Sequence, residues 1–208
     1  HNAQYWPNYT QHLIGGGMSY RMMYEWFDYH KYGHPKTYAI STIFAYHFLN
    51  EVVESAGYSR PSTDPIADLY LFDPLSILLF SNERVCNFFS NTLNMADWSY
   101  QPMIDPSNGT LSNASQNFVM KWKLPQLQKW ILFYFMGTHA ELGLSRHLDN
   151  NRCISVGVGM KADELIAVDD HSQTANLKLS GGIFYDRNNS LMASFLLAKS
   201  KDYKTRLN

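Results

Sequence analysis

Four polar residues fall on one face of a predicted helix within the segment YHFLNEVVES, residues 46–55. They are His47, Asn50, Glu51 and Glu54, and at about 3.6 residues per turn their side chains project in the same direction. An imidazole next to two carboxylates can serve as an oriented base or as part of a metal site. Because unpaired buried charge costs several kcal/mol, this polar line needs partners from other segments of the chain.

Two other segments carry groups that can meet the polar line. His12 is followed by glycines at 15–17, and glycines in a helix allow another backbone to come close. The loop at 62–68 contains the polar residues Ser62, Asp64 and Asp68. Since the remaining faces of the 46–55 helix are apolar, we predict that its polar line faces His12 and this loop rather than water.

One interpretation of these residues is a hydrolytic active site. Ser62 or Ser19 would act as the nucleophile in that case. The base would be His12 or His47, oriented by Glu51. The sequence contains no G-x-S-x-G nucleophile elbow, so no motif supports this chemistry.

A metal site and a structural network are the other two interpretations. Glu51 lies one helical turn after His47, a spacing that lets two ligands share an ion. The chain has neither an HExxH motif nor a Cys/His quartet, and we therefore predict no metal and no cofactor. We favour a buried hydrogen-bonded network between the first helix, the second helix and the Asp-Pro loop. Its members, which are also the candidate catalytic residues, are His12, His47, Glu51 and Asp64.

Helical patterns occupy the N-terminal half of the chain, in residues 12–30, 37–57 and 74–98. Residues 97–116 are rich in Asn, Ser, Pro and Gly, which indicates a linker. The charge changes at about the same point, because residues 1–114 hold 5 Lys+Arg against 10 Asp+Glu and the rest hold 12 against 8. The chain therefore has two differently built halves.

After the linker the hydrophobic pattern has a period of two. In CISVGVGMK, residues 153–161, Ile, Val, Val and Met alternate with Ser, Gly, Gly and Lys. NLKLSGGIFY, residues 176–185, repeats this pattern, and short polar turns between such runs indicate an antiparallel meander of five strands. We predict an α+β fold with a helical, membrane-apposed domain at 1–96, a linker at 97–116 and the β-meander at 117–208.

The composition of the strand faces favours contact with lipid. A soluble sandwich keeps large apolar residues inside and charges outside, whereas here the polar face consists of Gly, Ser, Asn and Lys, as in a barrel lumen. Aromatic residues near strand ends, where they mark a membrane interface, are Trp122, Trp130, Tyr185 and Tyr203. We predict a sheet of the outer-membrane β-barrel type, with a soluble antiparallel sheet or lipocalin-like barrel as the alternative. Five strands do not close a barrel, so further strands or a partner chain would complete it.

Membrane-spanning helices and nucleic-acid binding are disfavoured. No run reaches the roughly 18 apolar residues that a spanning helix needs. The net charge of −1 and the absence of a recognised motif argue against nucleic acid as a partner. No charged-then-apolar leader is present, which fits either a cytosolic chain or a removed signal peptide. Whether Cys86 and Cys153, in different halves, form a disulfide stays open.

Three segments of the N-terminal half form an ordered set of motifs: HNAQYWPNYTQHLIGGG, FAYHFLNEVVESAG and RPSTDPIADLYLFDPLSILLF. Over residues 8–80 the chain resembles an uncharacterised bacterial family, a domain of unknown function whose members are predicted to lie at the outer membrane. That family has a His-bearing first helix, a helix ending with Glu, and a Pro-Ser-x-x-Asp segment that runs into a Pro-containing apolar helix. A looser likeness extends to VanZ-like membrane domains. The family positions correspond here to His12, Glu51 or Glu54, Ser62, Asp64 and Asp68.

These features together predict an outer-membrane-associated structural or accessory protein of a bacterial envelope assembly. Its expected partners are lipid or the outer membrane, and other outer-membrane proteins. The alternative is an enzyme at the membrane surface that acts on lipid or cell-wall substrates through the His/Glu/Asp cluster. The resemblance implies no established activity.

Overall fold

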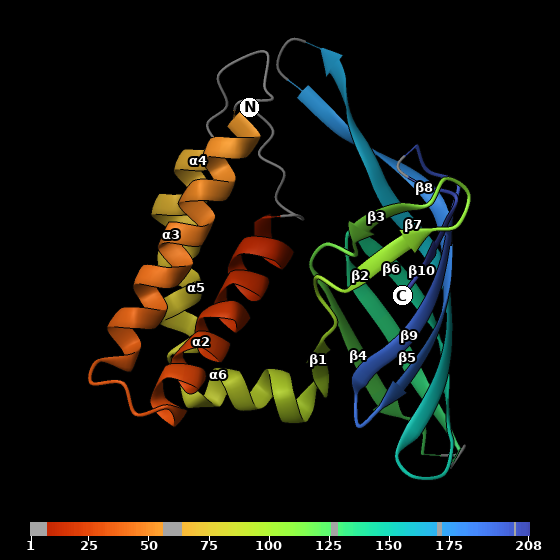
Figure 1. Ribbon diagram of the computed structural model, residues 1–208, viewed down its shortest axis with the longest axis horizontal. Helices are drawn as coiled ribbons and strands as arrows, with labels where there is room; N and C mark the ends of the chain where they lie inside the picture. Colours follow the sequence, from red (N-terminus) through yellow and green to blue (C-terminus); the bar gives the residue numbers. More distant parts are fainter. Residues whose placement is uncertain (1–7, 56–63, 126–128, 170–171, 202) are drawn as a thin grey trace. The chain divides into compact units, whose positions relative to one another are not determined.

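The computed structural model describes residues 8–55, 64–125, 129–169, 172–201 and 203–208 (Figure 1). The chain divides into a helical unit that ends at Asn87 and a sheet unit that begins at Phe88. An α+β fold is therefore confirmed, with helices first and an antiparallel sheet after them.

The helical unit contains α-helices and two π-helical segments. They are η1 (Asn8–Gly16), α2 (Gly17–Tyr29), α3 (Pro35–Ser55), α4 (Asp64–Ala67), η2 (Asp68–Phe72), α5 (Asp73–Phe80) and α6 (Glu83–Asn87), where η1 and η2 are π-helices. Proline stands in the first turn of α3 and of α5, where its missing N–H leaves no helical hydrogen bond unmade. None of the described helices is both long enough and apolar enough to cross a membrane.

Helix α3 shows why the polar line lies inside this unit. Its buried residues recur at every fourth position: Ala39, Ile43, His47 and Glu51. This spacing defines one stripe along the helix, so an aliphatic contact and a polar contact follow one another on the same face. Asn50, also expected on the polar line, is exposed instead, because it lies to the side of this stripe.

The sheet unit begins with a short π-helix, η3 (Phe88–Thr92), followed by ten strands among its described residues. They are β1 (Met95–Asp97), β2 (Pro102–Asp105), β3 (Thr110–Asn113), β4 (Asn117–Lys123), β5 (Trp130–Gly137), β6 (His139–His147), β7 (Arg152–Asp169), β8 (Ser172–Arg187), β9 (Ser190–Ala198) and β10 (Thr205–Leu207). Their order in one curled, antiparallel sheet is β1-β4-β5-β6-β7-β8-β9-β10-β2-β3 (Figure 1). The prediction of five strands was too low.

The predicted linker at 97–116 is wrong, because this segment belongs to the sheet. Between the β1–β4 and β2–β3 pairs, backbone hydrogen bonds join Trp98 N–H to the Asn117 carbonyl and Tyr100 N–H to the Ser115 carbonyl. β1 and β3, the two ends of the strand order, therefore belong to one long hairpin. Its turn residues produced the linker-like composition, since Asp105 accepts hydrogen bonds from the backbone and hydroxyl of Ser107 at the tip.

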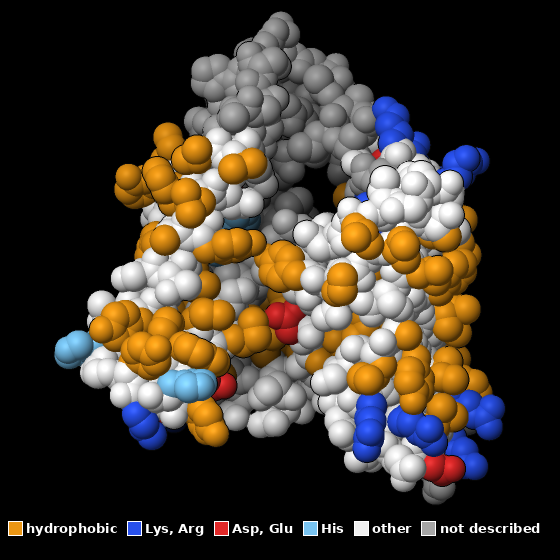
Figure 2. Space-filling model, in the orientation of Figure 1, with side chains coloured by type: hydrophobic (Ala, Val, Ile, Leu, Met, Phe, Trp, Pro, Cys, Tyr) orange, Lys and Arg blue, Asp and Glu red, His pale blue; other side chains and the backbone are white. Residues whose placement is uncertain are grey.

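The alternation in β7 sorts its side chains as the sequence predicts. Ser155 and Gly157 are buried. The residues that follow each of them, Val156 and Val158, are 50% and 67% exposed. The same holds across β6–β9, whose outward residues are Leu142, Leu144, Ile154, Val156, Val158, Met160, Leu177, Leu179, Ile183 and Leu197, each 42–72% exposed. We call this set the outer apolar face. Figure 2 shows hydrophobic side chains along the visible flank of the sheet unit, with Lys and Arg side chains at both of its ends.

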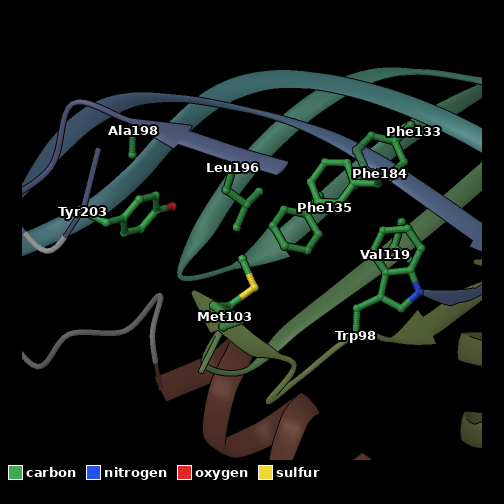
Figure 3. Packing of buried hydrophobic residues seen from close by; sticks show 10 residues of the cluster. Trp98, Met103, Val119, Phe133, Phe135, Phe184, Leu196, Ala198 and Tyr203 are labelled. Atoms are coloured by element: carbon green, nitrogen blue, oxygen red, sulfur yellow. The ribbon is translucent and has the colours of Figure 1, made fainter. Parts of the chain in front are cut away.

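The inside of the curl holds an aromatic cluster. The ring centroids of Phe133 and Phe135 lie 5.2 Å and 4.8 Å from that of Phe184, and the Trp98 ring centroid lies 5.6 Å from it (Figure 3). Gly157 makes room for it, because a Cβ at that position would lie 3.1 Å from Phe133.

Polar and charged groups share this interior. The buried polar residues of β4 and β6–β9 are Asn117, Lys121, His139, Glu141, Ser145, Ser155, Lys161, Ser180, Asp186 and Ser194. Lys121 Nζ donates to Asp186 Oδ2 at 2.5 Å, and the hydroxyls of Ser145 and Ser155 are hydrogen-bonded to each other. The sheet therefore has a polar and aromatic interior beneath an apolar exterior.

Candidate functional site

The helical unit contains a buried cluster of imidazoles and carboxylates, centred on Asp73. Asp73 is the first residue of α5 and is fully buried. Its Oδ1 atom lies 2.7 Å from Nδ1 of His47, which α3 brings to it. A histidine–carboxylate hydrogen bond of this length fixes the orientation of the ring.

His12, from η1, approaches the same oxygen of Asp73. Its Nδ1 atom is 4.0 Å from Asp73 Oδ1, and its Nε2 atom is 3.5 Å from Asp68 Oδ2. The His12 and His47 rings meet edge to face with their centroids 5.8 Å apart. Asp68 opens η2 and is almost completely buried. His12 thus stands between two buried carboxylates.

Glu51 completes the cluster from α3, one turn beyond His47. Its side chain is 5% exposed. A carboxylate oxygen of Glu51, a nitrogen of His12 and an oxygen of Asp68 all lie within 4.8 Å of one another. The same holds for one ligand atom each of His12, His47 and Asp73. The cluster therefore consists of two groups of three that have His12 in common.

The glycines after His12 make this arrangement possible. A Cβ at Gly16 would lie 3.1 Å from Cε1 of His47 and 3.8 Å from Asp73 Oδ1. A Cβ at Gly17 would lie 2.2 Å from the Phe80 ring. The prediction that glycines let the first helix approach closely is thus met at both positions. The buried Ser76 hydroxyl donates a hydrogen bond to the Asp73 backbone carbonyl at 2.8 Å.

The structure brings together three of the four candidate catalytic residues: His12, His47 and Glu51. The side chains of Asp64 and Glu54, and the whole of Ser62, lie outside the described residues. The residue that sequence reasoning missed is Asp73. Its signal was present, since it is a lone acid before an otherwise apolar helix, DPLSILLF, where a charge needs a buried partner.

The sheet unit has a second candidate site, a basic rim next to the outer apolar face. A surface hollow at the ends of β5, β6 and β7 is lined by Lys129, Arg146, His147, Leu148, Asp149 and Arg152. Arg187 on β8 pairs in register with Arg152. Positive side chains thus line this end of the sheet.

Neither cysteine forms a disulfide. Cys86 lies in α6 and Cys153 in β7, and both are free thiols. Burial raises the pKa of the Cys86 thiol above its ordinary value, which disfavours the reactive thiolate. A cysteine nucleophile at this position is therefore not supported.

The chain matches no protein-family model, no curated protein and no solved structure.

Proposed function

We propose that the outer apolar face contacts lipid and that the protein is an outer-membrane-associated structural or accessory component of a bacterial envelope assembly. The observation that carries this proposal is the inverted distribution of side chains over β6–β9. A sheet in water keeps its apolar face on the core and its polar face in solvent. Here Lys121, Glu141 and Asp186 are inside, while the outer apolar face is exposed.

The size of the outer apolar face supports lipid as the partner. Soluble monomers rarely expose a contiguous apolar patch larger than a few hundred Å². From Ile154 to Met160, at about 3.3 Å per residue, the outward side chains of β7 cover roughly 20 Å along the strand. The apolar band of an outer-membrane sheet is about 25 Å tall.

Strand length and charge point the same way. A strand that crosses a bilayer needs about 9–11 residues. β6 and β9 have 9 residues each, β7 has 18 and β8 has 16. The basic rim, with Lys129, Arg146 and Arg152, would lie beside anionic head groups, which attract such side chains by about 1 kcal/mol each.

The helical unit is consistent with a membrane-apposed position. Two successive turns of α3 carry four apolar side chains that are 51–74% exposed: Phe48, Leu49, Val52 and Val53. Covering these side chains with lipid or with another outer-membrane protein is favourable, because it removes apolar surface from water.

A lysine substitution in the outer apolar face tests lipid contact directly. Val158→Lys introduces a charge into the centre of the outer apolar face and is expected to cost about 2–4 kcal/mol in lipid. In water the same exposed substitution would change stability by no more than about 0.5 kcal/mol. The measurement is urea unfolding of the chain refolded into phosphatidylcholine vesicles. Ser112→Lys, at an exposed position of β3 outside this face, is the matched control.

The location of the protein gives the second test. In bacterial cells the protein should fractionate with outer membranes and resist extraction by carbonate or urea. Recovery in a soluble fraction, together with equal effects of Val158→Lys and Ser112→Lys, would overturn the proposal.

The buried cluster supports a second candidate function, an enzyme at the membrane surface that acts on lipid or cell-wall substrates. The observation in its favour is the 2.7 Å contact between His47 and Asp73, the arrangement of a base and the acid that orients it. His47→Ala and Glu51→Ala separate the two functions. A folded variant that has lost hydrolysis of envelope lipids supports the enzyme, whereas loss of folding supports a structural network.

A further inference from the structure

We propose that His12, His47 and Asp73 bind one divalent transition-metal ion, and that Asp68 holds the His12 ring in place for it. This inference does not depend on lipid contact by the sheet. It reverses the prediction, drawn from motifs alone, that the chain has no metal site. Motifs would not reveal such a site, because its ligands come from three elements, η1, α3 and α5, and not from one helix.

The donor atoms are already close enough for one ion. One ligand atom from each of the three residues lies within 4.8 Å of the other two. Metal bonds to nitrogen and carboxylate oxygen are about 2.0–2.2 Å long, so two ligands of one ion stand roughly 3–4 Å apart. The His47 Nδ1 and Asp73 Oδ1 atoms are 2.7 Å apart and need to separate by only a few tenths of an ångström. The ion would replace the hydrogen bond between them.

Asp73 provides the reason for a cation at this point. The residue is fully buried, and its Oδ2 atom accepts no hydrogen bond within the described part of the chain. Its ion pairs among the described residues are with His12 and His47, whose rings are charged only when protonated. A buried carboxylate with an oxygen that lacks a donor is costly, and a cation bound to Asp73 offsets the negative charge of this carboxylate.

A second carboxylate, that of Asp68, contacts the other ring nitrogen of His12. Asp68 Oδ2 lies 3.5 Å from His12 Nε2, while Nδ1 of the same ring points toward Asp73. A metal-binding histidine usually gives its other ring nitrogen to a carboxylate, which fixes the tautomer and the ring orientation. Asp68 is thus a positioning residue, and Glu51 lies beside it as a further acid of the same group.

The backbone is shaped to accommodate the ligands. Gly16 leaves the space next to His47 open, because a Cβ there would lie 3.1 Å from the ring. His12 and Asp68 both lie in π-helical segments, η1 and η2. Such widened turns occur frequently at functional sites, since they shift one side chain out of the regular helical spacing.

The ligand types select the class of metal. Imidazole suits Zn²⁺, Cu²⁺, Fe²⁺ and Ni²⁺, whereas Mg²⁺ and Ca²⁺ prefer oxygen ligands. Two imidazoles with one carboxylate leave further coordination positions open. The site is therefore assigned to a transition-metal ion, and not to Mg²⁺ or Ca²⁺.

The test uses the full, untagged chain in detergent, stripped with EDTA and titrated with Zn²⁺ alone by calorimetry. We expect saturable binding of one ion per chain, a rise in Tm, and no competition by an equal concentration of Mg²⁺. His47→Gln and Asp73→Asn should weaken binding at least tenfold, and Asp68→Asn about 10–100-fold. His34→Gln and Asp28→Asn, at exposed positions of the same unit, should bind like the wild type.

Co²⁺ gives a readout that needs no variant. Bound to imidazole and carboxylate in the wild-type chain, it should show visible absorption bands that Zn²⁺ abolishes by displacement. The proposal is overturned if the folded wild type shows no such bands and no saturable Zn²⁺ binding. It is equally overturned if a folded His47→Gln or Asp68→Asn variant binds Zn²⁺ as tightly as His34→Gln does.

Discussion

The helical unit and the sheet unit both bury charge, but they balance it in different ways. In the sheet, the Lys121 ammonium lies 2.5 Å from Asp186 and 5.3 Å from the centre of the Trp98 ring. In the helical unit, the ion pairs of Asp73 within the described residues are with two imidazoles. A lysine stays charged at neutral pH, whereas an imidazole can gain or lose a proton and can bind a metal. The Lys121–Asp186 pair in the sheet therefore has a fixed charge balance, whereas the charge balance around Asp73 can respond to its surroundings.

The largest expected effect tests the fixed balance in the sheet. Lys121→Met removes one partner of a buried ion pair and leaves Asp186 with an uncompensated charge. Loss of one such partner typically destabilises by about 3–5 kcal/mol. Urea unfolding of the detergent-solubilised protein measures the change in the free energy of unfolding.

Lys123→Met is the matched control, because Lys123 lies two residues further along β4 and is exposed. It should change stability by no more than about 0.5 kcal/mol. A double variant, Lys121→Met with Asp186→Leu, should recover most of the loss, since no charge is then left unpaired. If Lys121→Met and Lys123→Met were equally stable, the Lys121–Asp186 pair would not compensate buried charge in the sheet.

A smaller effect tests the close packing that builds the helical cluster. Gly17→Ala places a methyl group 2.2 Å from the Phe80 ring, where the ring or the helix must shift. Overpacking costs about 1–3 kcal/mol. Because alanine also recovers up to about 1 kcal/mol of helix propensity, we expect a net loss of about 1–2 kcal/mol. Thermal unfolding followed by circular dichroism at 222 nm measures it.

Gly33→Ala serves as the comparison, because a Cβ at that position meets no atom within 4 Å. This variant should unfold at the wild-type temperature or slightly above it. If Gly17→Ala behaves in the same way, close approach of α2 to α5 does not hold the cluster together.

The smallest effect contrasts a surface pair with the buried pair. Arg21 Nη1 lies 2.8 Å from Glu83, whose side chain is 69% exposed. Glu83→Ala should cost less than about 1 kcal/mol, and the cost should shrink further in high salt. Unfolding at low and high salt measures both values. A loss as large as that of Lys121→Met would mean that exposure does not decide the strength of these pairs.

Periodic patterns were the most reliable guide to the fold. The alternation in residues 153–161 predicts which side chains of β7 are buried, and the structure agrees for Ser155, Gly157 and Lys161. The strands before β4 were missed for a physical reason. They are three or four residues long, too short to show a period, and their hairpin is dominated by turn residues such as Asp105 and Gly109.

The sequence by itself determined the local features of this protein: an amphipathic α3 that places His47 and Glu51 on one stripe, and strands with one small polar face and one apolar face. These follow from the fixed periods of the helix and the strand. Only the tertiary structure decided which distant groups meet. Asp73 reaches His47 across 26 residues and Asp186 reaches Lys121 across 65, through packing and strand register that no local pattern encodes. Charged groups pair with the groups that lie near them in space. The His47–Asp73 and Lys121–Asp186 pairs can therefore be identified only in the folded chain.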